Sequence, residues 1–204
     1  MNGLTLETNE YLNKSIQVFY HSDYSGGCGR WKIEKTVENV ICTLKNDITP
    51  YSDVVLQKAV QHLSGILFKD LPEILQLIKL KKLTVCVIPR AKVDYNPNQL
   101  LFKSTISNVV NQLSGFSNGT DYLIRHTDTR TTHRNRAGYG GNGDMPYPGI
   151  TIKTCTISNY IVDKDILLID DLYTKTINID EDAIQALLDK GARSVIFYAI
   201  GRAV

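Results

Sequence analysis

Apolar residues along this chain form two kinds of pattern, strand-like runs and helical periodicity. Continuous apolar runs are typical of strands buried on both faces of a parallel sheet. Three such runs occur, at Leu83–Ile88, Ile166–Ile169 and Ser194–Ile200. Shorter or alternating runs predict further strands at Ser15–Tyr20, Tyr122–Arg125 and Gly149–Ile157.

Helical spacing recurs between these strands, with apolar residues three or four positions apart. It predicts helices over Ile33–Asn46, Ser52–Leu67, Pro72–Leu80, Asn98–Leu113 and Asp180–Lys190. The segment His21–Gly29 predicts a loop. The alternation of strands and helices predicts an α/β fold with a central, mostly parallel sheet flanked by helices. We expect residues 81–204 to form the core and residues 1–80 a small N-terminal α/β subdomain, a hood.

Composition bounds the class of protein. A chain of 204 residues suffices for one α/β domain with an added subdomain, and its net charge of +2 is too small to argue for nucleic acid. No apolar stretch resembles a secretory signal or approaches the roughly 20 residues of a membrane span. The cysteines are scattered singly, at Cys28, Cys42, Cys86 and Cys155. We therefore expect a cytoplasmic protein with reduced thiols and no membrane contact.

Two adjacent carboxylates, Asp170 and Asp171, end the apolar run Ile166–Ile169, and the polar turn Thr174–Thr176 follows. Charges at the end of a buried strand are unfavourable unless they leave the core and meet a ligand. Ligands of open α/β sheets bind at the carboxyl ends of strands. The sequence thus predicts a ligand site here. The competing interpretation is an ordinary strand, turn and helix with a solvated Asp pair.

The segment Leu167–Thr174 resembles the motif that binds phosphoribosyl pyrophosphate (PRPP) in type I phosphoribosyltransferases. The order of elements from Leu83 to Val204 also follows that family. Within it, Leu123–Arg125, Asp170–Thr174 and Gly191–Val195 are nearest to the ComF, or amidophosphoribosyltransferase-like, family. The cysteine-rich zinc module that ComF proteins often carry at the N-terminus is absent from this sequence.

This resemblance implies a type I phosphoribosyltransferase fold and a set of site residues. Asp170 and Asp171 would hold the ribose hydroxyls, and Arg90 and Lys92, after the first core strand, would hold the pyrophosphate. Mg²⁺ would be chelated by PRPP, with no direct protein ligand expected. The 5′-phosphate would bind to the following loop, at Thr174, Lys175, Thr176 and Asn178.

The phosphate loop departs from the family pattern. Thr176 stands where glycine is usual, and a β-branched residue hinders close approach of a phosphate. Lys175 could replace lost amide contacts with a positive charge. Three acids, Asp180 to Asp182, would repel a nearby phosphate unless they point away.

The segment Arg125–Gly149 combines arginine and glycine. Four of the eight arginines of the chain lie within residues 125–136, and a glycine-rich stretch follows. A loop of this length is usually functional, so we expect a lid in which Arg130, Arg134 and Arg136 contact pyrophosphate. A disordered insertion and a nucleic-acid contact strip are the alternatives. The strip lacks the aromatic residues of a single-strand binder, so we favour the lid.

These observations leave more than one function open. The favoured hypothesis is a phosphoribosyltransferase that transfers phosphoribosyl from PRPP to an acceptor and releases pyrophosphate. The alternative is a catalytically weak or inactive protein that senses PRPP or a related nucleotide and acts through a partner. A protein partner, a homodimer and binding to nucleic acid remain open, and nucleic acid is not favoured.

Overall fold

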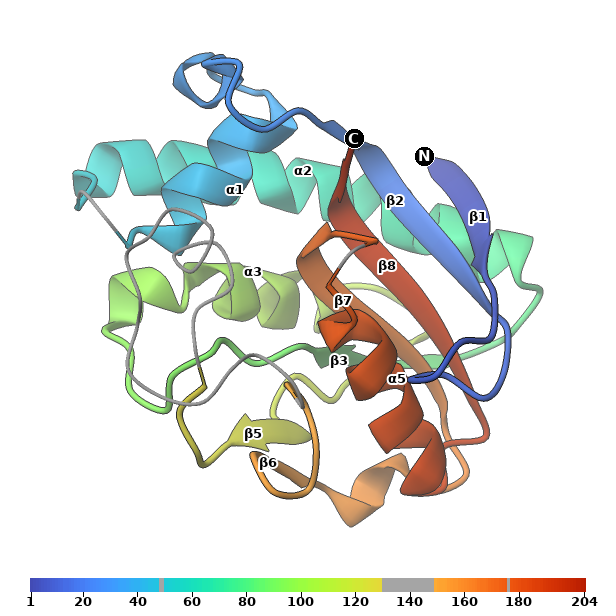
Figure 1. Cartoon of the computed structure of the whole chain (residues 1–204). Helices are drawn as coiled ribbons and strands as arrows, with labels where there is room; N and C mark the ends of the chain where they lie inside the picture. Colours follow the sequence, from blue (N-terminus) through green and yellow to red (C-terminus); the bar gives the residue numbers. More distant parts are fainter. Residues whose placement is uncertain (48–49, 130–148, 176) are drawn as a thin grey trace.

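A central parallel sheet organises the chain. The computed structural model describes residues 1–47, 50–129, 149–175 and 177–204. Within these ranges, six strands form one sheet in the order β1-β2-β8-β7-β3-β4 (Figure 1). The strands are β1 (Asn2–Leu6), β2 (Ile16–Tyr24), β3 (Leu83–Val87), β4 (Phe116–Asn118), β7 (Asp165–Tyr173) and β8 (Ser194–Ala203). β1 and β2 are antiparallel, and the other neighbouring pairs are parallel, which confirms the predicted α/β class.

Helices cover both faces of the sheet. One face packs against α1 (Val37–Lys45), α2 (Asp53–Leu77) and α3 (Leu101–Val110). The other packs against α5 (Ile179–Asp189) and a separate pair of strands, β5 (Leu123–Arg125) and β6 (Cys155–Ile157). Strand β7 contributes side chains to the hydrophobic core on both faces of the sheet, because successive side chains of a strand point to opposite faces. Leu167 and Ile169 face the first layer, whereas Ile166 and Leu168 face the second.

The predicted helices differ from those in the structure in their bounds, and α3 is three residues shorter at each end than the predicted helix Asn98–Leu113. The predicted helices Ser52–Leu67 and Pro72–Leu80 are one helix, α2, with Pro72 inside it. Leu67, Leu71 and Ile74 are all buried, so one apolar face continues across the proline and holds the helix together. The helix predicted from Ile33 begins only after Thr36, whose side chain accepts a hydrogen bond from the Asn39 amide at 3.1 Å.

Some strand predictions were also wrong in extent. Of the segment Gly149–Ile157 only the last three residues form a strand, because Thr154 closes a turn onto the Thr151 carbonyl at 3.0 Å. Its partner β5 stands outside the main sheet. The predicted loop from His21 is wrong at its start, since β2 continues to Tyr24 alongside β8. Strands β1 and β4 were not predicted.

The N-terminal residues belong to the same sheet as the core. Because β2 pairs with β8, the predicted boundary at residue 80 does not separate two sheets. Helix α1 then crosses close to β8 at Gly201, where an added Cβ would lie 3.0 Å from Ile41 and 3.1 Å from Val37. This close approach brings the end of α1, at Lys45, over the carboxyl end of β7. In the described part of the chain no helix is long and apolar enough to cross a membrane.

Candidate ligand-binding site

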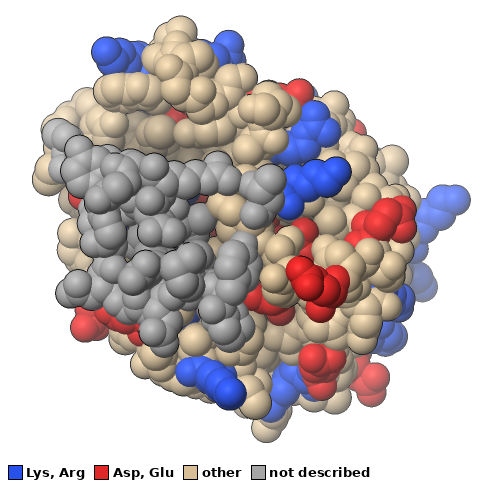
Figure 2. Space-filling view, in the orientation of Figure 1, with Lys and Arg blue, Asp and Glu red and all other residues tan. Residues whose placement is uncertain are grey.

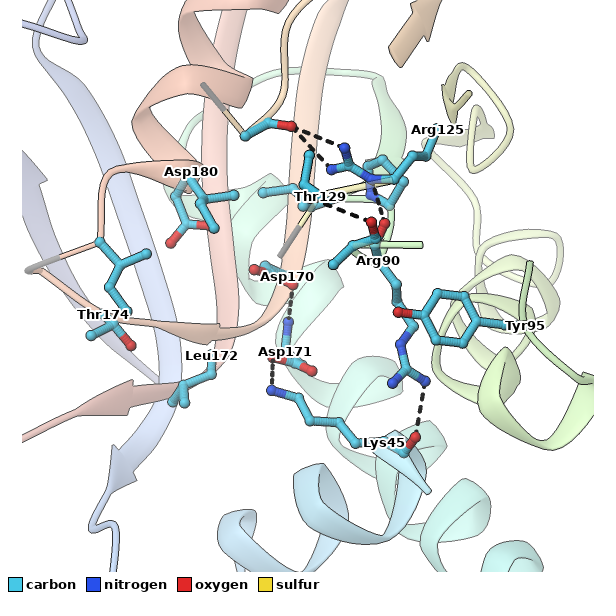
Figure 3. Close-up of a pocket in the computed structure, with 16 residues that line it drawn as sticks. Lys45, Arg90, Tyr95, Arg125, Thr129, Asp170, Asp171, Leu172, Thr174 and Asp180 are labelled. Atoms are coloured by element: carbon cyan, nitrogen blue, oxygen red, sulfur yellow. Dashed lines mark hydrogen bonds and ion pairs between the residues drawn. The ribbon is translucent and has the colours of Figure 1, made fainter. Parts of the chain in front are cut away.

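The predicted ligand site lies at the carboxyl ends of β3 and β7, which are adjacent and parallel. The amide of Ile88 donates to the Ile169 carbonyl at 3.0 Å, so the loop after β3 begins beside Asp170. A cavity of about 220 Å³ opens here (Figure 3). It is lined by the end of α1, the loop after β3, Arg125, the end of β7 and the start of α5. The volume is below the roughly 300–1,000 Å³ of drug-sized sites.

Asp170 and Asp171 both line this cavity, and each is held by a contact within the chain. The Asp171 amide donates to a carboxylate oxygen of Asp170 at 2.7 Å. The ammonium group of Lys45, at the end of α1, lies 3.1 Å from a carboxylate oxygen of Asp171. Burial alone would lower the pKa of Lys45, but the carboxylates of Asp171 and Asp170 outweigh burial and raise that pKa. Lys45 therefore stays positively charged in the site.

A second carboxyl group meets Asp170 from the first turn of α5. Asp170 and Asp180 line the same cavity and their carboxyl groups interact, and Asp180 is only 3% exposed. Burial, followed by repulsion from Asp171, raises the pKa of Asp170 to about 7. Burial and the charge of Asp170 raise the pKa of Asp180 well above its usual value. The pair thus retains at least one proton near neutral pH.

Arg90 lines the cavity, but its guanidinium group is already hydrogen-bonded and ion-paired to other groups of the protein. One nitrogen donates to the Lys45 carbonyl at 2.9 Å and the Gln99 carbonyl at 2.7 Å. The other terminal nitrogen pairs with Asp47 at 2.5 Å, and the group stacks on the Tyr95 ring with its carbon 4.1 Å from the centroid. Arg90 therefore braces the end of α1 against the loop after β3.

Arg125 is a buried arginine that joins three segments around the cavity. Its Nε donates to the Arg90 carbonyl at 2.5 Å, and both terminal nitrogens donate to the Gly149 carbonyl at 3.1 Å. A weaker bond of 3.4 Å reaches the Thr127 carbonyl. Burial lowers the pKa of Arg125, with partial compensation by Cys155, Tyr95 and Asp128. Arg125 fixes both flanks of the undescribed segment 130–148.

Several predicted phosphate ligands lie elsewhere. Thr174 lines the cavity, but Lys175 is exposed and lines a separate cavity with Arg202. Asn178 precedes α5 and is not among the residues lining the site. Lys92 is also outside it and lies 3.6 Å from Asp128. The remaining predicted contacts fall outside the described residues: Thr176, Arg130, Arg134 and Arg136.

The acids at the start of α5 do not all point away from the site. Glu181 is 1% exposed, while Asp182 accepts from the Gly149 amide at 3.1 Å. Burial raises the pKa of both carboxyl groups. Asp180, by contrast, lines the cavity. The end of the cavity at the β7–α5 turn is therefore acidic or proton-bearing.

Three site residues were missed as candidates by reasoning from the sequence, namely Lys45, Arg125 and Asp180. A lysine in the last turn of a helix is common and carries no distinguishing signal. Arg125 belongs to the Leu123–Arg125 resemblance, which was the available signal for it. Asp180 was noticed as a source of repulsion, but its pairing with Asp170 depends on the path of the turn between them.

The described residues form no cluster of metal ligands, and on the face shown in Figure 2 they form no basic strip for nucleic acid. Among the residues that the structure describes, no group of three or more His, Cys, Asp or Glu side chains is arranged to hold a metal. Carboxylates are nevertheless the oxygen donors that Mg²⁺ and its bound waters prefer, so Asp170 and Asp171 fit an ion carried by a ligand. The face shown in Figure 2 carries acidic side chains over α5 with basic side chains scattered around them. The described part of this face has no continuous basic strip.

Comparison with known proteins leaves the geometry as the guide to function. No protein-family model matches the chain, and no curated protein matches it significantly. The assignment of a ligand must therefore come from the chemistry of this cavity. That chemistry is a pair of adjacent carboxylates at a strand end, one lysine, two braced arginines and a further buried carboxyl group, Asp180, beside Asp170.

Proposed function

We propose that this chain is a phosphoribosyltransferase-like protein that binds PRPP, or a related nucleotide, in the cavity at the end of β7. The observation that carries the proposal is the position of Asp170 and Asp171. Both line a cavity at the carboxyl end of a central parallel strand, beside the loop that follows β3. Adjacent carboxylates at this position suit the two neighbouring hydroxyls of a ribose ring, because a carboxylate accepts hydrogen bonds and hydroxyls donate them.

In the proposed reaction the bond between the anomeric carbon and the pyrophosphate oxygen breaks. Pyrophosphate leaves with the electron pair, the acceptor's lone pair forms the new bond, and the acceptor loses a proton to a base. Asp170 and Asp171 orient the ribose while positive charge develops on the ring. Thr174 contributes a hydroxyl at the 5′-phosphate end. Mg²⁺ carried by PRPP, beside Asp170 and Asp171, would neutralise part of the charge of the pyrophosphate.

A catalytically weak or inactive sensor of PRPP is the second candidate. It is favoured by the internal pairing of both acids, since Asp171 contacts Lys45 and Asp170 contacts Asp180. A ligand must compete with these contacts. The exposed position of Lys175 also removes one predicted phosphate contact. Both features weaken the expected affinity and rate without removing the binding site.

Phosphorus NMR of PRPP incubated with the protein, Mg²⁺ and a panel of nitrogen-containing acceptors separates the two candidates. Release of pyrophosphate that depends on an acceptor and disappears in Asp171→Asn supports the transferase. Saturable binding of PRPP without release under any acceptor supports the sensor. An absence of both binding and release contradicts both candidates.

A further inference from the structure

Lys45 is the cation of the cavity that is most open to a ligand. Its side chain is 26% exposed, and among the described residues its ammonium group is bonded to Asp171 alone. An ammonium group has three N–H donors, so the ion pair with Asp171 leaves two for another partner. Arg90 and Arg125, the other cations that line the cavity, donate several bonds to backbone carbonyls.

The backbone of Lys45 is fixed on two sides. Its carbonyl accepts the 2.9 Å bond from Arg90, and α1 packs against the backbone of β8 at Gly201. The long side chain therefore extends into the cavity from an anchored position. Nothing in the local sequence of α1 requires a lysine there, because a cation in the last turn of a helix contributes little by itself.

The position of the Lys45 side chain indicates which end of a bound sugar it would contact. Figure 3 shows Lys45 and Arg90 on one side of the Asp170–Asp171 pair, with Thr174 and Asp180 on the other. If the two acids hold the neighbouring ring hydroxyls, the 5′ end of the sugar points to Thr174. The anomeric carbon then points to the side of Lys45 and Arg90.

We infer that Lys45 is a ligand-contacting residue whose ammonium group binds the anionic group on the anomeric carbon of the sugar. This inference rests on the proposed function and names a residue that the PRPP motif does not contain. Lys45 remains beside Asp171 and uses its free donors for the pyrophosphate oxygens. In the transfer step the same contact stabilises the negative charge that the leaving pyrophosphate gains.

Calorimetric titration with three probes tests this assignment. The probes are PRPP with Mg²⁺, pyrophosphate with Mg²⁺, and ribose 5-phosphate, which lacks the anomeric anion. We expect Lys45→Met to weaken binding of PRPP and pyrophosphate by roughly tenfold or more, the typical effect of losing a charge-assisted hydrogen bond. Binding of ribose 5-phosphate should stay within about threefold of wild type. Lys45→Arg should retain most of the affinity for all probes.

Lys58→Met is the matched control, because Lys58 is an exposed lysine that pairs with Glu34 and does not line the cavity. Wild-type affinity of Lys45→Met for PRPP would overturn the inference and leave the proposed function standing. So would an equal loss for all three probes, which would indicate a structural effect. If wild type binds none of the three probes, the proposed function itself fails and the inference fails with it. Thermal unfolding of each variant checks that it is folded.

Discussion

The carboxyl groups of Asp170 and Asp180 line the same cavity and interact where β7 leads into α5. Two neighbouring carboxyl groups with little access to water resist being ionised together, because burial and mutual repulsion both disfavour the second charge. Lys45 and Asp171 flank Asp170 on the other side. The charge at this end of the cavity therefore changes within the physiological range of pH, and both folding stability and ligand binding should respond.

We expect the stability of wild type, relative to Asp170→Asn, to fall between about pH 4 and pH 7. The pKa of Asp170 is raised from 3.8 to about 7, so the folded chain keeps a proton that the unfolded chain loses. This contribution is complete below the unfolded pKa and is lost as the pH rises through the folded pKa. Urea unfolding of both proteins across this range measures it. A stability difference that is constant with pH would show that Asp170 titrates normally.

The preference of the site between ligands with and without a 5′-phosphate should also depend on pH. Ribose 1-phosphate and ribose 1,5-bisphosphate differ only in the group that would face Thr174 and Asp180. As the carboxyl pair loses protons, we expect affinity for the bisphosphate, relative to the monophosphate, to fall by roughly tenfold from about pH 6.5 to about pH 9. Asp180→Asn should reduce this fall. The same pH profile in both proteins would exclude the pair as its cause.

Arg90 should contribute more to stability than Lys92, although the sequence suggests the same role for both. Arg90→Ala removes bonds to two carbonyls and the ion pair with Asp47, whose side chain is 8% exposed. We expect the unfolding free energy to fall by about 2–4 kcal/mol. Lys92→Ala removes a partly exposed ion pair and should change it by less than about 1 kcal/mol. Equal effects in urea unfolding would contradict the bracing role.

The close contact at Gly201 predicts how α1 responds to a small change in volume. An alanine Cβ there would lie 3.0–3.1 Å from Ile41, Leu172 and Val37. We expect Gly201→Ala to destabilise the fold by about 1–3 kcal/mol and to displace Lys45 from Asp171. Gly65→Ala in α2 is the control, because nothing lies within 4 Å of the added Cβ. That variant should gain about 0.5–1 kcal/mol from helix propensity. Destabilisation by both variants would argue against a specific contact.

Local patterns in the sequence predict the parts of the site that lie at strand ends. The apolar run before Asp170 and Asp171 identifies their strand, and a parallel sheet places the loop after β3 beside them. Lys45 could not be found in this way. Its position depends on α1 packing over Gly201, a contact between residues far apart in the chain.

Contacts between residues far apart in the chain also explain why the structure differs from the predictions at Pro72 and Arg90. Pro72 predicts a break, but the buried face that continues from Leu67 to Ile74 outweighs the loss of one amide hydrogen bond. Arginine suits both an anion and a cluster of carbonyls, so sequence alone could not separate a ligand from the brace that Arg90 forms. Tertiary contacts decide both cases.

The proposed function depends on PRPP binding at the Asp170–Asp171 cavity. Calorimetric titration of PRPP with Mg²⁺ into wild type, Asp171→Asn and Asp163→Asn tests it most directly. Asp163 is an exposed residue with φ 58°, a conformation that asparagine tolerates, and it provides the control. We predict binding by wild type and the control, and roughly tenfold or greater weakening in Asp171→Asn. Absence of binding by wild type, or equal binding by all three proteins, would contradict the account.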